Sequence, residues 1–277
     1  MKPVKPINVV ELFPPLSREL LMVLRALQPA DWARPTICSP WSVKDVAAHL
    51  LGGNLGRLWK RPRTSTPTDN PVQDYAELVR LINYDNEVWV QAARRISPES
   101  LIEFLDLTDR RLYEAFGSLD RNELARITVA WAGGNLPPNW FDIAREYTEK
   151  WLHQQHIREA VDQPLLTGQA WLFPVLDTFM RGLPRTFRNV KARNGTSVSV
   201  RITGESGGEW SLVREGVHWH LFAGRAAQAA CRVQIDQNLA WRLFTRGISR
   251  EEARQQVQID SNATLGEQVL ELVSIMA

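Results

Sequence analysis

Cysteine is scarce in this chain of 277 residues, and long apolar runs are missing. The two cysteines, Cys38 and Cys231, lie far apart and form no C-x-x-C pair, which argues against a disulfide framework and a thiolate-rich metal site. Any thiol chemistry would then use a thiol from outside the chain. No apolar run is long enough to span a bilayer, and the first residues lack the apolar stretch of a signal peptide. We therefore expect a cytoplasmic protein without a membrane partner.

Strong net charge is also absent. The formal charge is +2, with basic and acidic residues interspersed, so nothing indicates a nucleic-acid surface. The local cluster Lys60-Arg61-Pro62-Arg63 is interpreted as a solvated loop. The apolar share of 44% is ordinary for a globular protein, and 277 residues suffice for two domains, each with its own core.

The first part of the chain has the apolar spacing of helices. Ser42 and Ser97 are placed as N-caps, Ser42 with Asp45 three residues on and Ser97 with proline at the first helical position. The expected helices span residues 9–28, 43–59, 72–95, 98–119 and 140–161. Proline-rich loops, at 62–71 and 132–139, separate some of them. These features predict a helical bundle.

The pattern changes after Pro164. From Arg188 onward, glycine-containing turns separate short alternating runs, as in a β-meander, and a histidine pair at 218 and 220 is expected to point outward from the sheet. Helices are expected at 236–245 and 264–275, with a capping box at Ser249 between them. We predict two domains, a helical one at 1–165 and a mixed α/β one at 170–277, with the boundary between about Val161 and Gln169.

Three potential metal ligands follow one another in Glu149-Lys-Trp-Leu-His153-Gln-Gln-His156. Their spacing of i, i+4 and i+7 puts all three on one helix face. A carboxylate with two imidazoles suits zinc or a similar divalent ion. The signature His-Glu-x-x-His is absent, however, and a solvated or salt-bridged helix face has the same residue types.

A further histidine, His49, is followed by Gly52 and Gly53 on the helix expected at 43–59. Each glycine costs a helix interior about 1 kcal/mol relative to alanine. Empty space beside His49 is explained either by a bound ligand or by another helix that approaches closely. From this segment alone both explanations stay open.

Two motifs together resemble a known family. Trp41-Ser-Val-Lys-Asp-Val-Ala-Ala-His49-Leu-Leu-Gly-Gly, with Glu149-x-x-x-His153 much later, is similar to the metal-binding domain of the mycothiol-dependent maleylpyruvate isomerases and their DinB-like relatives. The chain from about Asp177-Thr-Phe-Met-Arg-Gly-Leu-Pro onward is similar to the sterol-carrier-like domain that follows in that family. The resemblance implies an α+β fold of two domains, a DinB-like four-helix bundle followed by a sterol-carrier-like α/β domain.

The resemblance also implies site residues and cofactors. His49, Glu149 and His153 would bind a divalent metal, usually taken as zinc, which activates the thiol of mycothiol or a related small cofactor. Gly52, Gly53 and His156 are assigned to the cofactor pocket; His156 has no fixed counterpart in the motif. An arginine of the C-terminal domain serves the active site in the family, and Arg242 and Arg246, four residues apart on an expected helix, are the candidates here.

Three functions remain open. The leading one is a metal-dependent thiol enzyme, either an isomerase of an unsaturated oxo acid or a thiol S-transferase, acting on a small molecule as a monomer or homodimer. The second is a hydrolase or amidase whose open metal position holds water. The third is a non-catalytic ligand-binding protein with a structural metal, for which His156 is the only obvious fourth ligand.

Overall fold

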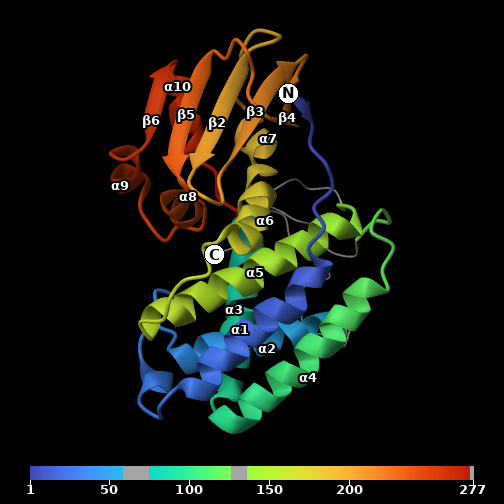
Figure 1. Ribbon diagram of the computed structural model, residues 1–277, viewed down its shortest axis with the longest axis vertical. Helices are drawn as coiled ribbons and strands as arrows, with labels where there is room; N and C mark the ends of the chain where they lie inside the picture. The colour runs from blue at the N-terminus through green and yellow to red at the C-terminus, as the bar shows by residue number, and fades with distance from the viewer. Residues whose placement is uncertain (59–74, 126–135, 275–277) are drawn as a thin grey trace. The chain divides into compact units, whose positions relative to one another are not determined.

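The computed structural model describes residues 1–58, 75–125 and 136–274, and it contains both helices and a six-stranded sheet (Figure 1). The α+β fold class expected from the sequence is thereby confirmed. The cluster Lys60-Arg61-Pro62-Arg63 lies outside the described residues, as do most of the two expected proline-rich loops. No helix among the described residues is long and apolar enough to cross a bilayer.

The chain divides into two compact units. The helical unit contains Val9–Arg121 and Glu149–Leu165, and the sheet unit contains Met1–Asn8, Asn122–Thr148 and Leu166–Met276. Among the described residues, the chain passes from the helical unit to the sheet unit for the last time after Leu165, which lies between Val161 and Gln169. Division into domains at 1–165 and 170–277 stays a prediction.

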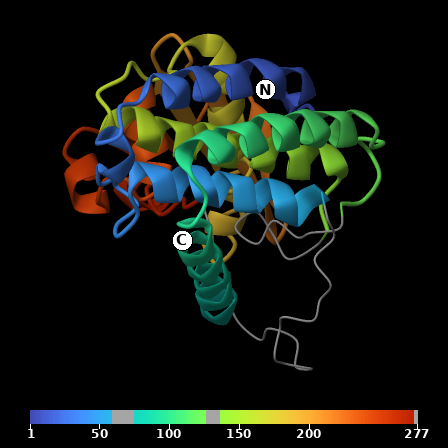
Figure 2. The same ribbon diagram turned by 90° about the horizontal axis from the view of Figure 1, so that it is seen from below.

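The helical unit is a bundle in which one helix, α3, is not aligned with the rest. Figure 2 shows α1, α2 and α4 running side by side, whereas α3 lies beyond α2, on which it packs, at a steep angle to these three helices. The bounds are α1 Phe13–Ala26, α2 Val43–Leu58, α3 Tyr75–Ala93, α4 Pro98–Gly117 and α5 Asn139–Ala160, with short 3₁₀ turns at Val10–Leu12 and Asp31–Ala33. Helix α5 belongs to this unit from Glu149 onward.

Local signals start two of these helices where the sequence predicts. The Ser42 hydroxyl accepts a hydrogen bond from the Asp45 backbone N–H, and the Asp45 carboxylate accepts one from the Ser42 N–H, which completes the shortened capping box. The Ser97 hydroxyl accepts from the Ser100 N–H, with Pro98 at the first helical position. Both N-cap predictions are confirmed.

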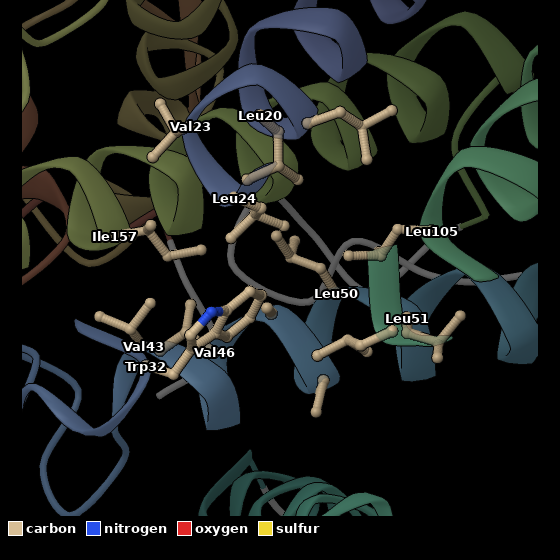
Figure 3. Close-up of a cluster of buried hydrophobic side chains, with 14 of the residues drawn as sticks. Leu20, Val23, Leu24, Trp32, Val43, Val46, Leu50, Leu51, Leu105 and Ile157 are labelled. Carbon is tan, nitrogen blue, oxygen red and sulfur yellow. The ribbon is translucent and has the colours of Figure 1, made fainter. Parts of the chain in front are cut away.

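The core of the helical unit lies between α1, α2, α4 and α5 (Figure 3). Leu24, Val46, Leu51 and Leu105 are at most 1% exposed, and Ile157 reaches the same cluster from α5. Burying a leucine or isoleucine side chain contributes about 1.5–3 kcal/mol relative to leaving it exposed. This cluster therefore supplies much of the free energy that holds the second half of α5 against α1 and α2.

A buried polar network joins the same four helices, and the sequence analysis missed it. The Lys150 ammonium of α5 donates to Asn54 Oδ1 of α2 at 2.6 Å and to Asp109 Oδ1 of α4 at 2.8 Å. Asn54 also donates to Asp109 Oδ1 and to Thr108, and the Ser17 hydroxyl of α1 donates to Asp109 Oδ2. Asn54 is fully buried, and only 11% of the Lys150 side chain and 8% of the Asp109 side chain are exposed.

The sheet unit has the strand order β1-β4-β3-β2-β5-β6, in which only β2 and β5 pair in parallel. The bounds are β1 Lys2–Pro3, β2 Ser197–Thr203, β3 Gly208–Glu215, β4 His218–Ala223, β5 Cys231–Asp236 and β6 Gln258–Ser261. Helices α6 Gln169–Met180, α7 Leu183–Thr186, α8 Gln237–Phe244 and α10 Ala263–Val269 pack against the strands, and α9 covers Arg250–Arg254. The meander β2–β4 and the capping box at Ser249 agree with the sequence. His218 and His220 are exposed, as expected.

Other parts of this unit differ from expectation. Helix α6 was missed because it contains Pro174 and is apolar nearly all round, so it lacks the polar stripe by which an amphipathic helix is recognised. Strands β1, β5 and β6 were also missed; β1 and β6 are only two and four residues long. The last described helix ends at Val269 rather than near residue 275.

Candidate metal centre

Helices α2 and α5 bring His49, Glu149 and His153 together. Glu149 Oε1 lies 3.3 Å from His49 Nε2 and 3.1 Å from His153 Nε2, and the two imidazole centroids are 4.6 Å apart. The three potential ligand atoms lie within 4.8 Å of one another. Glu149 and His153 are one turn apart on α5, so their spacing follows from helix geometry, whereas His49 is brought there by packing.

The residues fit a divalent ion. Two N or O ligands bound to one tetrahedral zinc at 2.0–2.1 Å are about 3.3 Å apart. Both distances from Glu149 Oε1 are close to that separation. Only 12% of the His49 and His153 side chains is exposed, but 36% of the Glu149 side chain is, so the carboxylate faces solvent in part. A carboxylate with two imidazoles is a common ligand set of catalytic zinc sites.

Glu149 and His153 shift each other's pKa in opposite directions. Burial favours the neutral form of Glu149, but the charge of His153 and the hydrogen bonds from His153 and His49 outweigh it and hold the pKa of Glu149 well below its ordinary value. Burial likewise disfavours the charged form of His153, yet the Glu149 carboxylate and the Cys38 sulfur raise the pKa of His153 to about 10. A metal must displace the His153 proton, since only neutral imidazole binds metal.

Trp41 packs beside the centre. Its indole lies 5.0 Å from the His49 imidazole, centroid to centroid, at an angle of 39°. The indole N–H donates to Glu87 of α3 at 2.8 Å, which fixes the ring. Trp41 therefore restricts the orientation of the His49 ring by contact. Its only indole N–H is used by Glu87, so it does not compete for the His49 nitrogen that faces Glu149.

The space beside Gly52 is occupied by the neighbouring helix α3. A Cβ atom at Gly52 would lie 2.5 Å from the Trp89 indole, whose N–H donates to the Ala48 carbonyl at 2.7 Å. Close helix packing, one of the two explanations left open by the sequence, accounts for this glycine. Gly53 is exposed. The cofactor role of both glycines stays a prediction.

Gly52→Ala is expected to destabilise the protein by about 1–3 kcal/mol, because the methyl group overpacks against a Trp89 ring that its hydrogen bond holds in place. Gly56→Ala is the matched control on the same helix. No atom lies within 4 Å of a Cβ at Gly56, so that change should stabilise by about 0.5–1 kcal/mol. Urea denaturation of the two variants measures both effects, and equal stability would contradict the packing explanation.

His156, on the same α5 face, lies beside Cys38 instead of Glu149. Cys38 Sγ is 3.0 Å from His156 Nδ1 and 4.0 Å from His153 Nδ1. Neither cysteine was expected to be a ligand, because no local spacing in the sequence links it to other ligands. Positions 38 and 156 are 118 residues apart, so only the folded structure reveals their proximity.

Comparison with known proteins identifies the family. The model of the mycothiol maleylpyruvate isomerase N-terminal domain matches residues 13–158, more than half of the chain. The chain belongs to this family. The match includes His49, Glu149, His153 and His156, and it confirms the resemblance drawn from the two sequence motifs.

Three solved structures extend the comparison beyond the residues matched by the family model. The crystal structure of the mycothiol-dependent maleylpyruvate isomerase matches with a TM-score of 0.50 and 15% identity over 91% of each chain, which shows a shared fold. A histidine-to-alanine mutant of that isomerase matches with a TM-score of 0.47 and 13% sequence identity, again over 91% of each chain. A UbiJ-SCP2 ubiquinone synthesis protein matches with a TM-score of 0.25 and 14% sequence identity, and the match covers 35% of this chain and 93% of that protein. No curated protein matches in sequence.

Arg242 and Arg246 lie outside the residues matched by the isomerase family model. The sequence placed both on one face of a helix, and this expectation is wrong. Helix α8 ends at Phe244, and Arg246 follows it in the left-handed region, with φ of 59°. The Arg242 guanidinium lies over the Trp241 ring, 4.2 Å from its centroid, and Arg246 is exposed. Their role in substrate binding stays a prediction.

Proposed function

We propose that this member of the isomerase family is an enzyme that uses a low-molecular-weight thiol, mycothiol or a relative, to isomerise an unsaturated oxo acid or to transfer the thiol to a small molecule. One observation supports the proposal. The region matched by the family model contains three potential metal ligands, from two helices, whose donor atoms converge within 4.8 Å.

His49, Glu149 and His153 would hold a divalent metal, which we propose to be zinc. Such an ion supplies a positive charge that keeps a coordinated thiol deprotonated at neutral pH, where a free thiol of pKa about 8.5 is mostly protonated. Three protein ligands leave one tetrahedral position for an exogenous group. The partial exposure of Glu149 is consistent with access from solvent.

The remaining residues would position these ligands and the substrate. Lys150, next to Glu149 on α5, hydrogen-bonds to Asn54 of α2 and Asp109 of α4. These bonds would fix the axial position of the ligand-bearing turn of α5 relative to α2. For the substrate carboxylate and the developing enolate we retain Arg242 or Arg246, since a guanidinium binds carboxylates with two parallel hydrogen bonds.

A structural metal would require a fourth protein ligand. The sequence offered only His156 for that position, and His156 Nδ1 lies 3.0 Å from Cys38 Sγ. Among the described residues, the ligand group that contains Glu149 comprises His49 and His153 without His156. This geometry favours an open, catalytic centre over a closed, structural one.

Thiol dependence tests the proposed function. Purified protein loaded with zinc should convert maleylpyruvate, or a related cis-unsaturated oxo acid, only when mycothiol or another small thiol is added. The absorbance of the conjugated oxo acid measures the conversion, and a thiol adduct detected by mass spectrometry would identify the transferase outcome. Zinc-dependent hydrolysis of amide or ester substrates without thiol would instead establish the hydrolase, and binding without any turnover would contradict an enzyme.

A further inference from the structure

Cys38, His153 and His156 form a second group of potential metal ligands. Their donor atoms, one sulfur and two imidazole nitrogens, lie within 4.8 Å of one another. Only 8% of His156 is exposed, and Cys38 is partly buried. All three residues belong to the helical unit, and α5 supplies two of them on successive turns.

The distances suit a sulfur-containing site. Sulfur and nitrogen ligands bound to one tetrahedral zinc at about 2.3 and 2.05 Å are separated by about 3.5 Å. Cys38 Sγ lies 3.0 Å from His156 Nδ1 and 4.0 Å from His153 Nδ1, so a shift of about half an ångström would make both separations suitable. Thiolate and imidazole ligands select zinc and other thiophilic ions over magnesium or calcium.

The orientation of His153 separates this group from the candidate metal centre. Its Nε2 atom faces Glu149 at 3.1 Å, whereas its Nδ1 atom faces Cys38. The two ring nitrogens point in different directions in the ring plane, so one ion cannot bind both. An ion held by Cys38 would therefore occupy a different position from an ion held by Glu149.

Backbone hydrogen bonds hold Cys38 in place before α2. The Cys38 N–H donates to the Thr36 hydroxyl at 3.2 Å, and the Trp41 N–H donates to the Cys38 carbonyl at 2.9 Å. The Thr36 N–H and hydroxyl both donate to the Trp41 carbonyl. This short, closed loop presents the Cys38 sulfur to α5 with little freedom to move away.

We propose that Cys38, His153 and His156 form a second metal site for a thiophilic divalent ion, adjacent to the candidate centre and sharing His153 with it. When both positions are filled, His153 would lose its remaining ring N–H proton to solvent and bridge the two ions as an imidazolate, one ion on each ring nitrogen. The proposal requires neither substrate nor external thiol, so it stands or falls independently of the proposed function.

Cobalt(II) is a suitable probe, because a cobalt–thiolate bond gives a charge-transfer band in the near ultraviolet that cobalt bound only to nitrogen and oxygen lacks. Reduced protein, desalted into thiol-free buffer, is titrated with cobalt(II). We expect the band in the natural protein and its loss in Cys38→Ser. Cys231→Ser is the matched control: that cysteine is buried in β5 of the sheet unit, and its replacement should leave the band unchanged.

His49→Ala decides whether the site is separate. This change removes a ligand of the candidate centre only, so the thiolate band should persist. Loss of the band in His49→Ala would mean that Cys38 ligates the candidate centre itself, and it would overturn a second site. Absence of the band in the natural protein, or its survival in Cys38→Ser, would overturn the proposal as well. Circular dichroism of each variant verifies that the helices are intact.

Discussion

Glu149→Gln is expected to lower kcat/KM of the thiol-dependent reaction by about a thousandfold, a loss of about 4 kcal/mol in transition-state stabilisation. Glutamine keeps the size of the side chain but removes the negative charge that compensates a divalent ion. A neutral amide would then stand where the carboxylate oxygen lies 3.3 Å from His49 and 3.1 Å from His153, and an amide is a weaker ligand for a divalent ion. Atomic emission measures the loss of bound zinc from the variant, and steady-state kinetics measure the loss of kcat/KM.

Glu103→Gln supplies the control for this change, because Glu103 is an exposed carboxylate on α4 of the same unit. Its replacement should alter neither activity nor metal content. Retention of full activity by Glu149→Gln would contradict its role as a ligand. Loss of activity together with full retention of zinc affinity would assign Glu149 to the reaction chemistry instead of metal binding.

Asp109→Ala is expected to destabilise the protein by about 3–5 kcal/mol, the usual cost of breaking a buried ion pair by removing one partner. The Lys150 ammonium, 2.8 Å from Asp109 Oδ1, would lose its counter-charge in a place where little of its side chain meets water. Asn54 and Ser17 would lose an acceptor at the same time. The midpoint and slope of urea unfolding give the change in the free energy of unfolding.

The matched control is Asp106→Ala, one turn earlier on α4. Asp106 pairs with Arg110 and Arg25, but 38% of its side chain is exposed, so its removal should cost only about 0–1 kcal/mol. If the two variants lose the same free energy of unfolding, the network around Asp109 is not desolvated and the prediction is wrong. In the background of Asp109→Ala, a Lys150→Met change should restore part of the lost stability because it removes the uncompensated charge.

Local chemistry explains which parts of this fold were predictable. The N-caps at Ser42 and Ser97, the capping box at Ser249 and the meander β2–β4 depend on residues a few positions apart, and the sequence contains that information directly. Helix α6 has no comparable signal, because a helix buried on most sides loses its polar stripe. The helix expected at 236–245 ends at Phe244, and Arg246, expected on the same helix face as Arg242, follows it in the left-handed region.

The candidate centre was predictable only in part, for the same reason. Glu149 and His153 converge through helix periodicity, and the addition of His49 came from family resemblance and not from spacing. The contacts of Cys38 with His153 and His156 span more than a hundred residues of chain, and those of the Lys150 network span 41 to 96 residues. Such juxtapositions depend on how the helices pack, which no local pattern encodes.

Two cross-connections between α2 and α5 have a consequence for how an ion is acquired. His49 meets Glu149, and five residues further along α2 Asn54 meets Lys150, the next residue of α5. The second connection, with the apolar core, fixes the register of the two helices without any ion. Zinc fingers depend on their ion to fold. We expect this chain to reach its native structure first, so an ion bound at the proposed centre would be loaded late and could exchange while the protein stays folded.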